Sequence, residues 1–90
     1  MNEARVKRAR LRAWRRGFRE ADLILGSFAD ARAASMSEAE LASFERLLDA
    51  PDQDLYAWIV GAAPTPAAFD SPVLDSIRDH ARTGLMARGG

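Results

Sequence analysis

The sequence predicts an all-α protein, folded as a compact five-helix bundle in a single domain over residues 1–90. Apolar residues recur at the spacing of amphipathic helices, and no run alternates apolar and polar residues as a half-buried strand does. The 90 residues, 48% of them hydrophobic and 29% charged, provide one modest core rather than two. We expect the chain ends, residues 1–4 and 87–90, to fray.

The first two helices are predicted over residues 5–14 and 20–33, with Gly17 between them. Many arginines surround a narrow apolar stripe in the first helix. In the second helix Leu23 points away from the apolar face, so we expect it to be exposed or functional. The apolar face of the second helix comprises Ala21, Ile24, Leu25 and Phe28.

The third helix has the clearest start of the five. Ser37 and Glu40 form the S-x-x-E pattern of a capping box, and the helix is predicted to run to Asp49. We expect Asp52 to cap a short fourth helix. Gly61 suits the end of that helix, because glycine adopts the left-handed conformation without penalty.

The last helix follows a predicted loop over residues 61–68, where two closely spaced prolines resist helix formation. Ser71 followed by Pro72 is the pattern of a helix N-cap and first helical residue. This helix is predicted to continue to about Leu85. We expect His80 to be solvated on its polar side.

Composition excludes several kinds of chemistry. The chain has no cysteine and one histidine, which excludes disulfides, a cysteine nucleophile and a zinc site built from histidines. No stretch approaches the roughly 20 apolar residues that cross a bilayer, and no signal-peptide core follows the N-terminal charges. We therefore expect a cytoplasmic protein that is not an enzyme.

The charges are unevenly distributed although they sum to zero. Only Glu3 opposes the basic residues of the N-terminal segment, and acids dominate after it. A basic end on a neutral protein suggests an acidic partner surface or a phosphate-bearing ligand. Eight of the 13 basic residues lie in this segment, namely Arg5, Lys7, Arg8, Arg10, Arg12, Arg15, Arg16 and Arg19.

Gly17 lies inside this basic segment, between two helix-forming runs. A helical glycine costs roughly 1 kcal/mol relative to alanine, so its position calls for a reason. One reason is a turn or cap that needs a positive φ. The other is close approach of another chain, whose backbone could lie against a residue without a Cβ. The residues alone leave both open.

Two motifs together resemble one known family. R-R-G-x-x-E-x-D-L begins at Arg15, and L-L-x-x-x-D-x-D-L-Y-x-W-x-x-G begins at Leu47 and ends at Gly61. The chain from about Arg5 to Gly61 is thereby similar to the succinate dehydrogenase assembly factors, called SdhE in bacteria and assembly factor 2 in mitochondria. R-G-x-x-E alone would be weak evidence for this resemblance, but the second motif lies at the expected distance from it along the chain.

The resemblance implies a chaperone in the form of a five-helix bundle. Such proteins bind the flavoprotein subunit of succinate dehydrogenase, and often that of fumarate reductase. They promote the covalent bond between a histidine of that subunit and FAD, so the partner carries FAD and this chain binds no cofactor stably. We expect a monomer when it is free. The resemblance assigns partner binding to Arg16, Gly17 and Glu20, with Arg15, Phe18, Arg19 and Leu23 in secondary roles.

Simpler interpretations compete at several positions. Arg16 and Glu20 are four residues apart and could pair on the surface. Trp58 suits core packing better than a binding platform, since it shares a face with apolar neighbours. Asp52 and Asp54 resemble a metal pair, but a helix cap and first-turn charge explain both.

Two other functions compete with the assembly factor. The arginine-rich first helix could bind nucleic acid through phosphates, or the chain could be an antitoxin-like regulator. Against nucleic acid, few aromatic residues are interleaved and no helix-turn-helix pattern is present. No residue pattern selects an antitoxin.

Overall fold

The structure, a computed structural model, describes residues 3–89, with side chains up to Thr83. Among these residues it confirms the predicted all-α fold of five helices and no strands. Two short 3-10 turns, η1 (Ala33–Ser35) and η2 (Ala67–Phe69), lie between helices. The helices are α1 (Glu3–Ala13), α2 (Arg19–Arg32), α3 (Glu38–Leu48), α4 (Asp52–Val60) and α5 (Pro72–Gly89).

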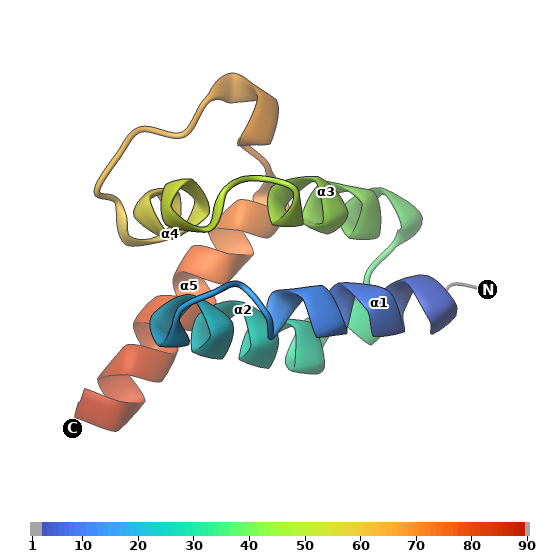
Figure 1. The fold of residues 1–90 in the computed structure, drawn as a ribbon, viewed down its shortest axis with the longest axis horizontal. Helices are drawn as coiled ribbons and strands as arrows, with labels where there is room; N and C mark the ends of the chain where they lie inside the picture. The colour runs from blue at the N-terminus through green and yellow to red at the C-terminus, as the bar shows by residue number, and fades with distance from the viewer. Residues whose placement is uncertain (1–2, 90) are drawn as a thin grey trace.

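The helices form two pairs joined by the last helix. Figure 1 shows α1 and α2 side by side in the lower half, with α3 and α4 following each other along the upper half. The last helix, α5, crosses behind both pairs and packs against α2, α3 and α4. The first helix, α1, packs mainly against α2 and α3, so one of its sides is left uncovered.

A single apolar core lies where these helices meet. The rings of Phe28 and Phe44 pack together at its centre, with 5.5 Å between their centroids. Trp58 is 7% exposed and packs on Phe69, which confirms that it belongs to the core. The largest fully buried side chains are Phe28, Phe44, Leu25, Leu41, Leu47, Leu55, Leu74 and Ile77.

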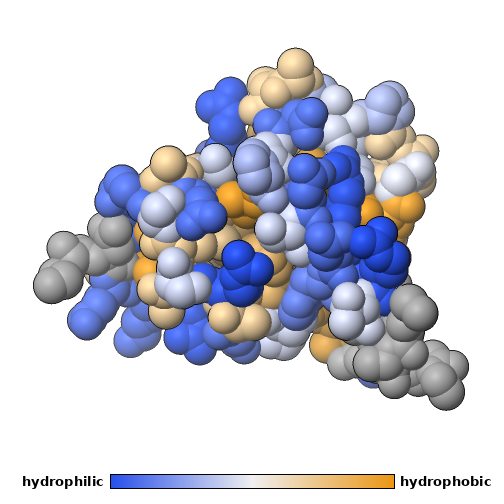
Figure 2. All heavy atoms as spheres, turned by 180° about the vertical axis from the view of Figure 1, so that it is seen from behind, coloured by the Kyte–Doolittle hydropathy of each residue, from blue (hydrophilic) through white to orange (hydrophobic). Residues whose placement is uncertain are grey.

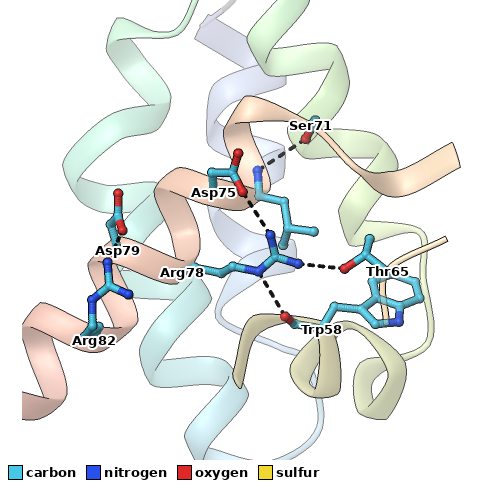
Figure 3. Close-up of polar contacts among 8 residues, drawn as sticks. Trp58, Thr65, Ser71, Asp75, Arg78, Asp79 and Arg82 are labelled. Atoms are coloured by element: carbon cyan, nitrogen blue, oxygen red, sulfur yellow. Dashed lines mark hydrogen bonds and ion pairs between the residues drawn. The ribbon is translucent and has the colours of Figure 1, made fainter. Parts of the chain in front are cut away.

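The predicted helix ends are confirmed at three of four positions. Ser37 Oγ accepts from the Glu40 N–H, and the Glu40 carboxylate accepts from the Ser37 N–H, as in a capping box. Gly61 ends α4 in the left-handed conformation, with φ of 79°. Ser71 Oγ accepts from the Leu74 N–H at 3.2 Å (Figure 3).

The prediction that Asp52 caps α4 is wrong. Pro51 occupies the N-cap position, and Asp52 is the first residue of the helix. Its carboxylate pairs with Arg16 instead. The helix dipole still favours acidic residues in this first turn, which contains Asp52 and Asp54.

Two arginines tie the predicted loop to the bundle. Arg78 donates to the Trp58 carbonyl at 3.1 Å and to Thr65 Oγ1 at 2.6 Å, and Figure 3 shows both bonds as dashed lines. Arg46 donates to the Ala68 carbonyl at 2.9 Å. The loop therefore has fixed contacts, and its end adopts the 3-10 turn η2, which the sequence did not indicate.

Helix boundaries differ from the predicted ones by a few residues. The last helix continues to Gly89, beyond the predicted end at Leu85. Residues 1, 2 and 90 lie outside the described part of the chain, and fraying of residues 1–4 and 87–90 stays a prediction. Within the described residues, no helix combines the length and apolar character needed to cross a membrane.

His80 is not solvated as predicted but half-buried between α5 and α2. Its Nε2 lies 2.8 Å from Ser27 Oγ, and its ring meets Phe28 edge-on. Ser27 Oγ–H donates to the Leu23 carbonyl, so the hydroxyl oxygen accepts from His80. Burial, and then the charge of Arg32, lower the pKa of His80 below its ordinary 6.5.

This lowered pKa predicts a pH dependence of stability. Unfolded His80 binds a proton more readily than folded His80, so stability is complete above pH 6.5 and falls as the pH drops through the folded pKa. We expect the free energy of unfolding in urea to decrease from pH 7.5 to 5. His80→Gln should flatten this slope, because it keeps a polar partner for Ser27 without titrating. An equal slope of unfolding free energy against pH in the unaltered chain and in His80→Gln would contradict the assignment of this pH dependence to His80.

Candidate functional site

The segment between α1 and α2 is a fixed turn exposed to solvent. Gly17 has φ of 119°, a conformation that only glycine adopts readily, and it is exposed. A Cβ added there would lie 2.6 Å from Oδ2 of Asp52. The turn interpretation of Gly17 therefore holds, and the residue also lies where another chain can reach it.

The side chain of Arg16 is buried, with 7% of its surface exposed. Its Nη1 donates to the Leu48 carbonyl and its Nη2 to the Ala50 carbonyl, both at 2.5 Å. Nη2 also lies 2.9 Å from Oδ1 of Asp52. These three partners span the turn from α3 to α4, so one guanidinium fastens the Gly17 turn to it. We call this set the Arg16 clamp.

Burial and the nearby charges act against each other on Arg16. Burial lowers its pKa, and the negative charge of Asp52 opposes that effect. Nε is buried without a hydrogen-bond partner, whereas both terminal nitrogens are bonded. The guanidinium thus depends on Asp52 for charge compensation.

Arg16 therefore does not fit the direct partner contact predicted for it. Its charged group faces inward and contacts the α3–α4 turn, and it does not pair with Glu20 either. Arg16 instead fixes the backbone of the Gly17 turn against the α3–α4 turn. The sequence could not reveal this because the acceptors lie more than 30 residues away.

Asp22, to which the sequence patterns assign no role, fastens the same turn from the other side. Its Oδ1 accepts from the Arg16 N–H at 2.6 Å, and its own N–H donates to the Phe18 carbonyl at 3.0 Å. Asp22 belongs to the first motif quoted above, and Asp52 belongs to the second. The motifs therefore mark both residues, but they do not show which groups the two carboxylates bind.

The remaining predicted residues lie at the surface around the turn. Arg15, Arg19 and Glu20 are exposed, and Leu23 is partly buried. Phe18 is partly buried because its ring meets that of Tyr56 edge-on, with 5.2 Å between centroids. A shallow hollow beside them is lined by Gly17, Phe18, Asp52 and Gln53. The surface thus joins the Gly17 turn to the start of α4.

Half of the N-terminal basic residues form ion pairs with acidic residues of this chain. Together with the other contacts of the Arg16 clamp, these ion pairs join α1 to the other helices. The positive field of the segment is therefore weaker than the sequence suggests. The ion pairs are Arg5 with Glu38 and Glu45, Arg10 with Asp30, Arg12 with Asp49 and Arg16 with Asp52. Within the described residues Lys7, Arg8, Arg15 and Arg19 form no ion pair.

Comparison with known proteins identifies the family. The family model described as the flavinator of succinate dehydrogenase matches residues 7–81. The chain belongs to this family. The flavinator family is the one that the two motifs indicate, so the resemblance is confirmed. Neither the nucleic-acid nor the antitoxin alternative gains support from these matches.

Relatives within the flavinator family carry consistent names. The FAD assembly factor SdhE of Acetobacter pasteurianus is 36% identical over 87 residues, which cover 97% of this chain and 77% of the relative. Succinate dehydrogenase assembly factor 2 of Dictyostelium discoideum is 37% identical over 67 residues, covering 74% and 48%. That of Scheffersomyces stipitis is 39% identical over 83 residues, covering 86% and 56%. The chain spans about half the length of these mitochondrial relatives.

Two positive-φ glycines provide a matched test of the turn. At Gly61 an added Cβ meets nothing within 4 Å, whereas at Gly17 it meets Asp52. We expect Gly61→Ala to lower the free energy of unfolding by about 1 kcal/mol through backbone strain alone. Gly17→Ala should cost about 2 kcal/mol or more, because alanine adopts a φ of 119° less readily than one of 79° and the added Cβ also displaces the clamp carboxylate. Equal losses of unfolding free energy in the two variants, measured by urea denaturation, would contradict the effect predicted for the contact between Gly17 and Asp52.

Neighbouring arginines provide a matched test of the clamp. Arg16→Lys keeps the charge, but a single ammonium cannot reproduce the fork that bonds two carbonyls and a carboxylate. We expect it to lower the free energy of unfolding by about 2 kcal/mol or more. Arg15→Lys, at an exposed position, should change it by less than about 0.5 kcal/mol. Similar values for the two variants would show that the clamp contributes little.

Proposed function

We propose that this chain promotes covalent attachment of FAD to the flavoprotein subunit of succinate dehydrogenase. Membership of the flavinator family carries the proposal. The names of the relatives support it, since they describe FAD assembly and succinate dehydrogenase assembly. The fixed, exposed Gly17 turn supplies a surface suited to docking.

In this proposal the chain acts by binding and supplies no reacting atom. The histidine that bonds to the flavin, and the flavin itself, belong to the partner. The chain has no cysteine, and its single histidine is engaged with Ser27 between two helices. It accelerates attachment by binding the reactive arrangement of the subunit more tightly than other arrangements.

The proposed docking residues divide into contacts and supports. Arg15, Gly17, Arg19 and Glu20 are exposed and available to the partner. Phe18 and Leu23, both partly buried, form its apolar border. Arg16 acts as a positioning residue behind them. This division keeps most of the predicted site and changes the role of one residue.

Further parts of the prediction accompany this proposal. The resemblance implies the flavoprotein subunit of fumarate reductase as a second partner. A cytoplasmic location and a monomeric free state stay predictions as well. The bacterial SdhE relative supports a common role for the two proteins.

The test is co-expression with the flavoprotein subunit and measurement of flavin fluorescence in the denatured subunit after electrophoresis. We expect the unaltered chain to raise covalent flavin and Glu20→Ala to reduce that gain severalfold, because Glu20 is exposed and has no ion pair within the described residues. Glu20 is a cleaner probe than Gly17, whose substitution also disturbs the clamp.

Asp70→Ala is the matched control, since Asp70 is an exposed acid in the loop before α5. It should leave covalent flavin unchanged, and both variants should unfold at the urea concentration of the unaltered chain. No increase in covalent flavin with the unaltered chain would refute the proposed function. Equal activity of Glu20→Ala and Asp70→Ala would refute the site.

A further inference from the structure

The first helix has one side that no other helix covers. Its opposite side contributes Ala9 and Ala13 to the core, and it packs against α2 and α3. Residues three and four apart share a side of a helix, so the uncovered side continues from α1 into the Gly17 turn. We call it the outer face of α1. It comprises Lys7, Arg8, Leu11 and Arg15, and the half-exposed Trp14 lies at its border with α2.

This face presents two large apolar side chains to solvent. Leu11 is 50% exposed and Trp14 is 38% exposed, and only Val60 is comparable among the described residues. Figure 2 views the molecule from behind, and there hydrophobic residues lie in small patches between hydrophilic ones. Leu11 and Trp14 are thus two of the three exposed large hydrophobic side chains among the described residues, and both belong to the end of α1 and the turn after it.

The Trp14 ring is held in place before any partner binds. Its Nε1 donates to Asp30 Oδ2 at 3.1 Å. Its ring lies against Gly26, where an added Cβ would come within 2.1 Å of Cδ2. A side chain that is already ordered loses little conformational entropy on binding, which favours its use as an anchor.

The cations of this face differ from those beside it. Arg5, Arg10 and Arg12, on the same helix, all form ion pairs with acids of α2, α3 or the turn after α3. Lys7, Arg8 and Arg15 form none within the described residues, although the chain carries as many acids as bases. The outer face therefore combines an apolar centre with unpaired positive charge.

We propose that the outer face of α1 is a second part of the docking surface and binds an acidic segment of the flavoprotein subunit. An apolar side chain of that segment would pack on Leu11 and Trp14, and its carboxylates would pair with the surrounding cations. Charge complementarity selects this occupant. The inference rests on the proposed function and extends its surface, since Arg15 leads directly into the Gly17 turn.

A protein segment fits this face better than nucleic acid does. Phosphates would use the cations but would gain nothing from an exposed Leu11. The indole N–H of Trp14 is already bonded to Asp30, so it has no hydrogen to donate to a phosphate. An acidic amphipathic segment uses both the apolar centre and the charged border.

The experiment measures binding of the purified, unflavinylated flavoprotein subunit by calorimetry at two salt concentrations. We expect Leu11→Glu to weaken binding roughly tenfold or more, as for an interface anchor. Val60→Glu is the matched control on α4, with 46% exposure, and should change binding less than about twofold. The double variant Lys7→Glu and Arg8→Glu should bind more weakly and depend less on salt.

The outcomes separate this inference from the proposed function. Unchanged binding by Leu11→Glu and by the double variant, with the unaltered chain binding well, would overturn the inference alone. Absence of binding by the unaltered chain would overturn both. A third outcome would assign the face to nucleic acid instead. In that outcome the unaltered chain binds mixed-sequence DNA at physiological salt, and the double variant Lys7→Glu and Arg8→Glu loses DNA binding but keeps subunit binding. Helicity and urea unfolding of each variant confirm that it folds.

Discussion

The buried guanidinium of Arg16 is the interaction on which the rest of the site depends. Removing a charged group from water costs several kcal/mol unless hydrogen bonds and an opposite charge replace the water. Here two carbonyls at the end of α3 and the carboxylate of Asp52 do so. Because those acceptors all lie in the α3–α4 turn, satisfying the charge forces the Gly17 turn against it. The position of the candidate surface follows from this electrostatic requirement.

The R-G-x-x-E segment thereby contains residues with different tasks. Arg16 faces inward and fixes the backbone, while Gly17 permits the positive φ and leaves space for Asp52. Glu20, the second residue of α2, remains exposed. A short motif of this kind combines the residues that build a surface with those that occupy it, so a loss of function at Arg16 and one at Glu20 would have different physical causes.

The same principle organises the basic N-terminus. Arginines that reach acids of neighbouring helices hold α1 in the bundle, and Trp14 is fixed over Gly26 by contact and by its bond to Asp30. Of the cations left without such partners, Lys7, Arg8 and Arg15 share the outer face of α1 with Leu11, and Arg19 begins α2. The fold thus divides the basic N-terminal segment into arginines that form ion pairs within the molecule and cations that remain available to a partner.

The sequence by itself determined the five helices, their main start and stop signals and the family, because these depend on residues close together in the chain. The capping box at Ser37 and the left-handed Gly61 are local events of this kind. Only the tertiary structure decided the direction of Arg16, the partner of Asp52 and the burial of His80. Each depends on groups more than 30 residues away, whose approach is set by packing of the whole core rather than by any local pattern.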